Sequence, residues 1–424
     1  MARRVDNKKQ YRTLWIIIAV ILCVTFAAAA VLFALNYVDS GVDPVSEMRA
    51  KNVILLIGDG MGFNHIKAGN IYSGSRLQME RFAVSGEVMT RSLTPGATDS
   101  AAAATAMATG IKTYNGRIAY KDGKNLTTVA EMAMAEGKKV GVVVTKAVTD
   151  ATPAAFLTHA SDRGETQSIA EQLVNSDVDV LFGLGDEYMY ALADSIATDE
   201  REYCTTFQTI ADAVQSSEKE KIFGLLKDGS IQNFGANTLA QLTRNALTKL
   251  SAEADDGFFL MVEGSKIDSA SHDNDMQAML NELQAFNATV SACKEWAAAN
   301  GDTVVIVTAD HETGGLKVPD IKDASEAYDA LLDFDSSDKW FTKTGHTSVN
   351  VGYYIYATST TPIVGSVEAV DNNGDIIFDA NGEPVMVDVV TGYAEIDYSA
   401  LMDIPEEIDN TDIFELIKQW LLTE

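Results

Sequence analysis

Five short apolar runs recur along the chain, and no other feature constrains its fold as strongly. Each run is about five residues long, is rich in Val, Ile, Leu and Phe, and lacks strict apolar–polar alternation, which is typical of strands buried on both faces of a parallel sheet. The runs are 53–57, 140–145, 178–182, 258–262 and 304–308. Stretches that favour helices separate them, at 99–110, 126–136, 238–254 and 276–299. We therefore expect an α/β fold with a doubly wound, mostly parallel central sheet and helices on both faces.

The N-terminal segment differs from the rest of the chain. Residues 1–13 are basic, and an almost uninterrupted apolar run follows at 14–35. About 20 apolar residues span a bilayer, whereas the apolar core of a cleavable signal peptide is usually about 7–15 residues long. We expect a transmembrane anchor at 14–36, with 1–13 on the cytoplasmic side because positive charge is retained there. The alternative is a signal peptide cleaved within 27–30, which would release a secreted form.

After the anchor, we expect a linker at 37–50 and one large domain at 51–424, outside the cytoplasmic membrane. Two segments of this domain have the character of insertions. Residues 186–235 are irregular and polar, and residues 367–390 contain two Asn-Gly pairs between β-prone runs, which is typical of a hairpin. The domain contains Cys204 and Cys293, and its sequence is compatible with either a disulfide or two free buried thiols.

The charge balance excludes one broad class of partner. Asp and Glu number 61 and Lys and Arg number 32, which gives a net charge of −29. Binding to DNA or RNA depends on Lys and Arg side chains that neutralise phosphates, so we expect no nucleic-acid partner. A local basic site remains compatible with binding of a small anion.

Acidic side chains follow four of the five runs. Asp59 follows the first run, Asp150 the second and Asp310 the last, while Glu263 and then Asp268 follow the run at 258–262. Ligands of such sheets bind outside the carboxyl ends of the strands, so we expect these carboxylates to meet at one edge. A single aspartate in such a place often only caps a helix. The repetition at four strands is what favours a site.

Imidazoles accompany two of these acidic segments. His272 follows Asp268 by four residues and His311 is adjacent to Asp310, in a chain with five histidines. So much negative charge in one crevice is unfavourable without cations. Carboxylate and imidazole ligands together suit Zn²⁺, and an oxygen-only set suits Mg²⁺. The glycines of 58–62 also match a weak dinucleotide-loop pattern, but an aspartate within that loop would repel a pyrophosphate.

A candidate nucleophile and a candidate anion clamp complete the set. Ser100 opens the Ala-rich stretch 99–110, where backbone N–H groups and the helix dipole favour an anion. A metal beside Ser100 would lower the pKa of its hydroxyl and make it a nucleophile. The alternative is that Asp99 or Ser100 only caps the helix. Arg163 is the natural bidentate clamp for a phosphate in such a crevice, although an isolated arginine is usually a solvated surface residue.

Six strings, in this order, resemble those of the alkaline phosphatase family. The resemblance covers residues 51–356, with a weaker piece at 409–413, and the strings are VILLIGDGMG, TDSAAAATA, TDATPAAF, VEGSKID with a later His, VTADHETGG and GHT. It implies an alkaline-phosphatase-like catalytic domain over 51–424 that hydrolyses phosphate monoesters at alkaline pH through a phosphoserine. It also implies two Zn²⁺ and one Mg²⁺ per subunit, and a homodimer.

The resemblance implies a role for each matching residue. Ser100 would be the nucleophile, and Arg163 would hold the phosphate oxygens. Three sets of residues would bind the cations: Asp268, His272 and His346 the first Zn²⁺, Asp59, Asp310 and His311 the second Zn²⁺, and Asp59, Thr152, Glu263 and, through water, Asp150 the Mg²⁺.

The chain departs from the family at Ser269, where members carry Lys, His or Trp near the third cation, and at Ser348, where a glycine is more usual. We interpret His159 as a structural histidine rather than a residue at the rim of the crevice. Two other functions remain open: a phosphodiesterase or sulfatase on the same two-metal scaffold, and an inactive surface protein that binds metal or phosphate. No Cys/Ser-x-Pro-x-Arg context surrounds Ser100, which argues against a sulfatase.

Overall fold

The computed structural model describes residues 50–227, 237–252, 254–368, 384, 386–396 and 404–422. The predicted anchor at 14–36 and almost all of the linker at 37–50 lie outside these residues, so both stay predictions. Within the described residues, no helix combines the length and the apolar character that a membrane span requires.

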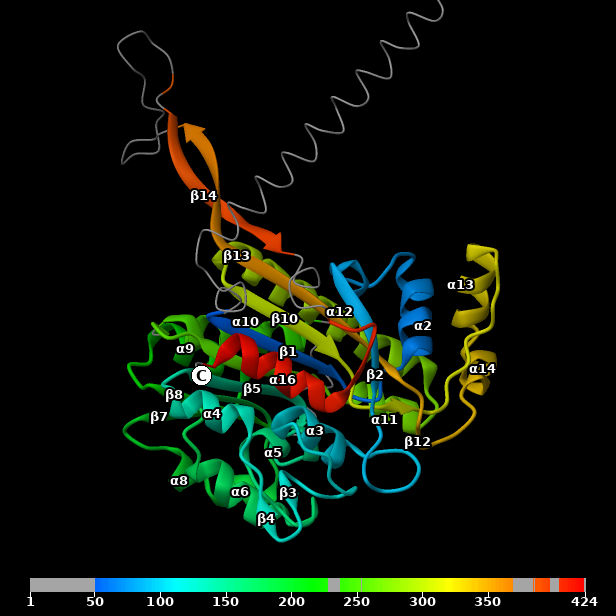
Figure 1. Cartoon of the computed structure of the whole chain (residues 1–424), viewed down its shortest axis with the longest axis horizontal. Helices are drawn as coiled ribbons and strands as arrows, with labels where there is room; N and C mark the ends of the chain where they lie inside the picture. Colours follow the sequence, from blue (N-terminus) through cyan, green and yellow to red (C-terminus); the bar gives the residue numbers. More distant parts are fainter. Residues whose placement is uncertain are drawn as a thin grey trace, which may run out of the picture. The chain divides into compact units, whose positions relative to one another are not determined.

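The centre of the domain is a mixed sheet with a long parallel part (Figure 1). Its strands are β1 (Asn52–Gly58), β2 (Val84–Met89), β5 (Lys139–Ala147), β6 (Val180–Leu184), β7 (Arg201–Cys204), β8 (Lys221–Leu226), β9 (Phe258–Gly264), β10 (Thr303–Thr308), β13 (Val351–Glu368), β14 (Met386–Ile396) and β15 (Glu407–Asp409). In the described residues these eleven strands follow the order β15-β2-β13-β10-β1-β9-β5-β6-β8-β7, with β14 paired to β13. The strands from β10 to β7 are parallel, whereas β13 runs antiparallel to β10 and to β2.

The five predicted strands are confirmed, and they lie side by side. The apolar runs form β1, β5, β6, β9 and β10, which are neighbours in the order β10-β1-β9-β5-β6. Every residue of β1, β6, β9 and β10 is buried. Burial on both faces removes the need for alternating polar residues, which explains the continuous apolar runs.

Helices cover both faces of the sheet (Figure 1). α10 (Thr238–Ala252) and α12 (Met276–Asn300) pack together on one face, and α3 (Ser100–Thr109), α4 (Val129–Ala135), α5 (Ala151–Leu157) and α16 (Asn410–Leu421) lie on the other. The four predicted helices correspond to α3, α4, α10 and α12. In the described residues, the remaining α-helices and short strands are α2 (Phe63–Ser73), α6 (Thr166–Asn175), α7 (Glu187–Ala191), α8 (Ala193–Ile196), α9 (Phe207–Ser216), α11 (Lys266–His272), α13 (Ala324–Leu332), α14 (Phe334–Ser337), β3 (Tyr120–Lys121), β4 (Lys124–Asn125), β11 (Glu312–Thr313) and β12 (His346–Thr347).

Residues 186–235 are not the irregular segment that their polar composition predicted. Their described part contains α7, α8, β7, α9 and β8, and the strands β8 and β7 extend the parallel sheet beyond β6. The apolar run 222–226 in β8 is buried, so this segment belongs to the core. The polar stretch 217–220 is only the connection between α9 and β8.

An antiparallel arm, formed by the outer part of β13 and by β14, extends from the sheet (Figure 1). The antiparallel pairing is what the β-prone runs within 367–390 predicted, while both Asn-Gly pairs lie outside the described residues. Within the body of the sheet, β13 lies between β10 and β2, which adds an antiparallel part that was not predicted.

The two cysteines of the domain are not bridged. Cys204 lies in β7 and Cys293 in α12, and both are free thiols buried in the protein. Of the two alternatives left open by the sequence, the free buried thiols are therefore correct.

Candidate active site

The carboxyl ends of β1, β5, β9 and β10 meet at one edge of the sheet. The register aligns the last residues of β1 with those of β9 and β10, so side chains that follow these strands leave the sheet at neighbouring positions. This is the edge at which such sheets bind ligands. The acidic residues gathered here are Asp59, Asp150, Glu263, Asp268 and Asp310, as predicted.

Asp59, Asp310 and His311 form a fully buried group, which we call the inner cluster. Nε2 of His311 lies 3.2 Å from Oδ2 of Asp310 and 3.7 Å from Oδ1 of Asp59. These two carboxylate oxygens have no hydrogen-bond partner within the described residues, although buried polar atoms are normally paired. Candidate ligand atoms from all three residues lie within 4.8 Å of one another. Orphaned oxygens and a ring nitrogen that converge on one point fit a Zn²⁺ ion.

Asp268, His272 and His346 form a more open group, which we call the outer cluster. Nε2 of His272 lies 3.2 Å from Oδ1 of Asp268 and 3.2 Å from Nε2 of His346. Nδ1 of His272 is bonded to the carbonyl of Thr344, and Nδ1 of His346 to that of Thr98, so each Nδ1 carries the hydrogen. In the neutral rings, both Nε2 atoms therefore present lone pairs to each other. A cation between them would turn this repulsion into two metal–nitrogen bonds.

Thr313 joins the two clusters, and it was not among the predicted residues. Its hydroxyl lies 2.7 Å from Oδ1 of Asp268 and 3.2 Å from Nδ1 of His311. Since a carboxylate only accepts, the hydroxyl donates to Asp268 and accepts from Nδ1–H of His311. Nε2 of His311 is thus left as a lone pair facing the inner cluster. Burial lowers the pKa of His311 to about 4, so its ring is neutral, as a metal ligand must be.

The two clusters adjoin at His311, which lies close to ligand atoms of both. The sequence assigned this histidine to the inner set alone. The rings of His311 and His346 are stacked, with their centroids 3.6 Å apart. Candidate ligand atoms of Asp268, His311 and His346 also lie within 4.8 Å of one another. Two cations bound by these groups would therefore be neighbours.

Ser100 is the first residue of α3 and faces the inner cluster. Its Oγ lies 3.3 Å from Nε2 of His311, and the residue is buried. Asp99 caps the helix by accepting a hydrogen bond from the backbone N–H of Ala102 at 3.0 Å. The cap is therefore Asp99, which leaves the Ser100 hydroxyl available to the cluster. The N-terminus of α3 adds a positive dipole end beside this hydroxyl.

Arg163 is held near the start of α3 by two carboxylates. Its Nη2 donates to Oδ1 of Asp150 at 2.9 Å, and its Nη1 donates to Oδ2 of Asp99 at 3.4 Å. Oδ2 of Asp99 also accepts a hydrogen bond from the backbone of Gly116. One aspartate thus links the helix of Ser100 to the guanidinium. The Arg163 side chain is 35% exposed, so an anion can still reach it.

The residues predicted for a third cation lie beside a lysine. Thr152 and Glu263 are buried, and Oε2 of Glu263 has no hydrogen-bond partner in the described part of the chain. Burial and the nearby charge of Asp150 raise the pKa of Glu263 to about 8. Lys146, which was not predicted, places its Nζ 3.7 Å from Oδ2 of Asp59 and 3.9 Å from Oδ2 of Asp150. Burial alone would lower the pKa of Lys146, but the surrounding carboxylates raise it above its ordinary value.

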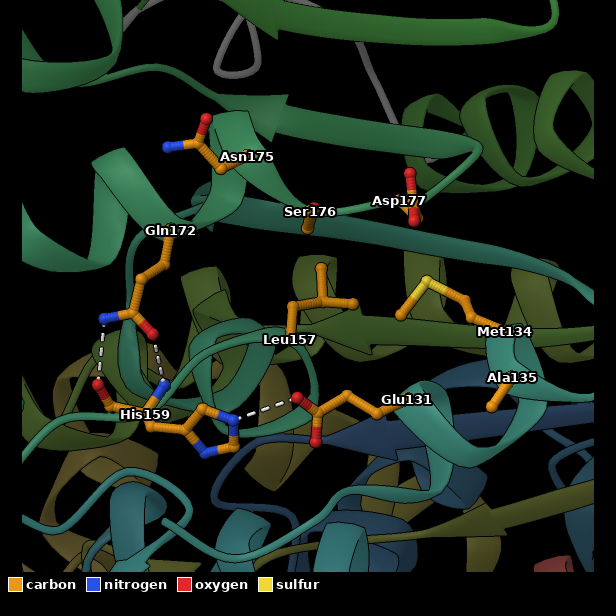
Figure 2. A pocket seen from close by; sticks show the side chains of 9 residues that line it. All are labelled: Glu131, Met134, Ala135, Leu157, His159, Gln172, Asn175, Ser176 and Asp177. Carbon is orange, nitrogen blue, oxygen red and sulfur yellow. Dashed lines mark hydrogen bonds and ion pairs between the residues drawn. The ribbon is translucent and has the colours of Figure 1, made fainter.

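His159 lies apart from both clusters, at a surface pocket of about 480 Å³. Figure 2 shows its ring turned toward Glu131, with Nε2 at 2.9 Å from the carboxylate. Nδ1 is bonded to the carbonyl of Ala119, and the Gln172 side chain is bonded to the backbone N–H and C=O of His159. All these bonds tie neighbouring segments together, which supports the structural interpretation of His159.

The chain is similar to alkaline phosphatases in sequence. It matches the family model described as alkaline phosphatase over residues 50–374. It is 35% identical over 289 residues to alkaline phosphatase 4 of Bacillus subtilis, a match that covers 63% of this chain and 62% of that protein. The alkaline phosphatase of Escherichia coli is 31% identical over 349 residues, which cover 66% of this chain and 74% of that protein. The match therefore spans less than two thirds of the length of the Bacillus relative.

The fold is similar to solved alkaline phosphatases. The enzyme from the Antarctic bacterium TAB5 superposes with a TM-score of 0.67 at 28% identity, over 89% of this chain and 99% of that chain. The cold-active enzyme from a Shewanella species gives a TM-score of 0.67 at 26% identity, over 88% and 100% of the two chains. A variant of the TAB5 protein was solved with Mg bound in its M3 site.

Proposed function

Because this chain belongs to the alkaline phosphatase family, we propose that it hydrolyses phosphate monoesters at alkaline pH through a phosphoserine intermediate on Ser100. The observation that supports this most is the position of the Ser100 hydroxyl, 3.3 Å from Nε2 of His311 at the N-terminus of α3. A serine placed beside converging metal-ligand atoms and a helix N-terminus suits phosphoryl transfer, which depends on positioning and on stabilising negative charge.

Two Zn²⁺ ions fit the inner and outer clusters. The fit rests on the orphaned oxygens of Asp59 and Asp310 and on the facing Nε2 atoms of His272 and His346. Asp59, Asp310 and His311 would hold one ion, and Asp268, His272 and His346 the other. When bound, such ions lower the pKa of a neighbouring hydroxyl and stabilise charge on the leaving oxygen.

The protein's own groups bind the substrate and carry the covalent step. Arg163 binds the non-bridging phosphate oxygens, for which its planar fork of donors is suited. Oγ of Ser100 loses its proton and attacks phosphorus in line, so that the Oγ–P bond forms as the bond from phosphorus to the alcohol breaks. The alcohol leaves with a proton. Water then attacks the phosphoserine, the Oγ–P bond breaks, and inorganic phosphate leaves as Ser100 regains its proton.

A third cation, Mg²⁺, fits this site less well. Asp59, Asp150, Thr152 and Glu263 offer oxygen ligands of the kind that Mg²⁺ prefers. The ammonium of Lys146 nevertheless lies against Asp59 and Asp150. These residues therefore do not fit a Mg²⁺ ion while Lys146 keeps its position, and no step of the reaction is assigned to one.

Two further parts of this proposal rest on the sequence. The catalytic domain would work outside the cytoplasmic membrane, held by the anchor at 14–36, and two copies would associate as a homodimer. Extraction of the full chain only by detergent, and a mass of two chains in sedimentation, are the expected results. A chain released by high salt or alkali, or a single-chain mass, would count against the respective part.

The test of the activity is hydrolysis of p-nitrophenyl phosphate by the full chain between pH ~7 and ~10, the window in which metal activation of a hydroxyl is effective. Chelation should abolish hydrolysis, and added Zn²⁺ should restore it. Ser100→Ala should lower kcat by more than about 1000-fold, as loss of a nucleophile does in other hydrolases. Zinc-loaded protein that is inactive on this monoester would contradict the proposal and favour a diesterase, a sulfatase or a binding protein.

A further inference from the structure

Lys146 brings a positive charge into the middle of the candidate cation sites. Its Nζ lies 3.4 Å from Oδ2 of Asp268, 3.7 Å from Oδ2 of Asp59 and 3.9 Å from Oδ2 of Asp150. The side chains of Asp59 and Asp268 are only 2% and 7% exposed, and that of Lys146 is 25% exposed. Salt therefore screens the contacts with Asp59 and Asp268 only weakly, whereas the side chain of Asp150 is 30% exposed. One ammonium therefore links three carboxylates that the metal sites need.

An irregularity in β5 aims this side chain. Between the aligned pairs Val143↔Phe182 and Ala147↔Leu184, β5 has three residues where β6 has one. Extra residues of this kind bend a strand and redirect its side chains, and they are common next to active sites. Lys146 is the last of the three. The bulge therefore places Lys146 at the carboxyl end of β5, close to Asp59, which follows β1, and to Asp268 of α11.

Two of the three contacts divide the oxygens of Asp59 and Asp268, the two aspartates of the candidate zinc sites. Lys146 takes Oδ2 of Asp59 and Oδ2 of Asp268, whereas Oδ1 of Asp59 faces His311 and Oδ1 of Asp268 faces His272. The ammonium donates a hydrogen bond to Oδ2 of Asp268 and attracts Oδ2 of Asp59, which favours these rotations of the two carboxylates. One oxygen of each remains turned toward a candidate zinc position.

The same contacts occupy the carboxylates that a third divalent ion would use. Oδ2 of Asp150 contacts Lys146, and its Oδ1 accepts from Arg163 at 2.9 Å, so both oxygens already have cationic partners. Mg²⁺ requires a near-octahedral shell of oxygen ligands and waters. A neighbouring ammonium would also repel it.

We propose that the ammonium of Lys146 takes the place of the third divalent cation, so that this site works with two metal ions and one built-in lysine charge. This inference rests on the proposed function, because it assumes that the inner and outer clusters bind Zn²⁺. Lys146 is a positioning residue: it acts through Asp59, Asp150 and Asp268.

The experiment counts metal ions in the detergent-solubilised full chain. Wild type, Lys146→Ala and Lys146→Arg are dialysed against trace Zn²⁺ with excess Mg²⁺, and the metals bound per chain are measured by elemental mass spectrometry. Mg²⁺ binding is also titrated by calorimetry. The matched control is Lys139→Ala, which removes a lysine from the other end of β5, where Nζ of Lys139 pairs with Asp179 at 3.0 Å.

We expect wild type, Lys146→Arg and Lys139→Ala to hold zinc at both clusters and to retain no Mg²⁺. Lys146→Ala should bind Mg²⁺ at least about tenfold more tightly than wild type, because a unit charge within about 4–6 Å changes the binding of a proton by about 10- to 1000-fold. Its hydrolysis of the monoester should become dependent on added Mg²⁺. If Lys146→Ala does not fold, Lys146→Gln takes its place.

A wild type that retains one Mg²⁺ per chain beside its zinc overturns the inference, whatever the variants do. It also fails if the uncharged variants bind Mg²⁺ no better than wild type, or if they only weaken the binding of inorganic phosphate, since Lys146 would then be a substrate contact. Zinc-loaded wild type that hydrolyses no monoester would instead refute the proposed function, and the Mg²⁺ counts would still decide the role of Lys146.

Discussion

The inner and outer clusters use the same two ligand types, but they differ in how they are built and in how far solvent reaches them. In the inner cluster, the side chains of Asp59, Asp310 and His311 are at most 2% exposed. In the outer cluster, the side chain of His272 is 39% exposed and that of His346 is 18% exposed. The inner ligands follow two adjacent strands, whereas the outer ones come from α11 and from β12, which lies far along the chain but pairs with β11 beside His311. The candidate metal position beside Ser100 is thus closed to solvent, whereas the outer one is partly open to it.

The largest effect should come from Asp310→Asn, which breaks the inner cluster with little change of shape. Oδ1 of Asp310 accepts hydrogen bonds from the backbone of Gly60 at 3.1 Å and of His311 at 2.9 Å, and an asparagine can keep both. Its amide nitrogen would replace the orphaned Oδ2, and a donor cannot bind a cation. We expect hydrolysis to fall by more than about 100-fold, beyond what a weakened supporting contact causes. Zinc titration checks this, and excess Zn²⁺ should not restore the activity.

Retention of full zinc content together with near-normal turnover in Asp310→Asn would contradict the assignment of a metal to the inner cluster.

A smaller effect is expected from His272→Ala, which removes the most exposed ligand of the outer cluster. Water can reach the vacated position, so Asp268 and His346 can still hold an ion. We expect activity at trace Zn²⁺ to fall between about 10- and 100-fold, the range of one weakened metal contact, and to return when Zn²⁺ is added. The measurement is kcat/KM against zinc concentration. If added zinc does not restore the activity of His272→Ala, the two clusters do not differ in the way proposed.

The smallest effect is expected from His159→Gln, a histidine outside both clusters, which should leave zinc content and hydrolysis unchanged. Its hydrogen bond with Glu131 raises the pKa of His159 above 6.5, against the opposing effect of burial. Burial alone would raise the pKa of Glu131, but the bond with His159 lowers it below 4.5. The pair therefore stabilises the fold most at pH values between the lowered pKa of Glu131 and the raised pKa of His159. The stabilisation is lost as pH rises through the raised pKa, because His159 loses its charge. It is also lost as pH falls through the lowered pKa, because Glu131 becomes protonated.

We expect this pair to stabilise the fold by only about 0.2–1 kcal/mol, because Glu131 is 35% exposed. Urea unfolding of wild type and variant at pH ~5.5 and ~8.5 measures it, and the difference between them should shrink at the higher pH. A difference that grows with pH, or any loss of zinc, would place His159 in the site instead.

The site residues that directly follow a strand could be predicted from the sequence. Those whose position depends on a local irregularity or on a tertiary contact could not. Asp59 and Asp310 follow β1 and β10 directly, so the end of an apolar run locates them. Lys146 is directed by a bulge in β5, and Thr313 becomes a link only when the two clusters adjoin. Neither a bulge in a strand nor a contact between a strand and a helix distant in sequence can be recognised from the spacing of apolar residues.

The same reasoning explains which strands were missed. Strands buried on both faces are apolar whichever way they run, so the antiparallel course of β13 between β10 and β2 could not be deduced from its composition. The run 222–226 in β8 is short, is interrupted by Gly224 and follows a polar loop. For these reasons it was interpreted as part of an insertion rather than as a strand of the sheet. The anchor at 14–36 stays a prediction because it lies outside the described residues.

The two buried thiols can be used to measure local and global unfolding of this protein. Burial raises the pKa of Cys204 to about 11 and also raises that of Cys293, so neither forms the reactive thiolate while the fold is closed. Cys204 lies in β7 at the edge of the sheet, whereas Cys293 lies in the long helix α12. With Cys23 replaced by alanine, the labelling rates of the two positions would separate fraying of the sheet edge from global unfolding.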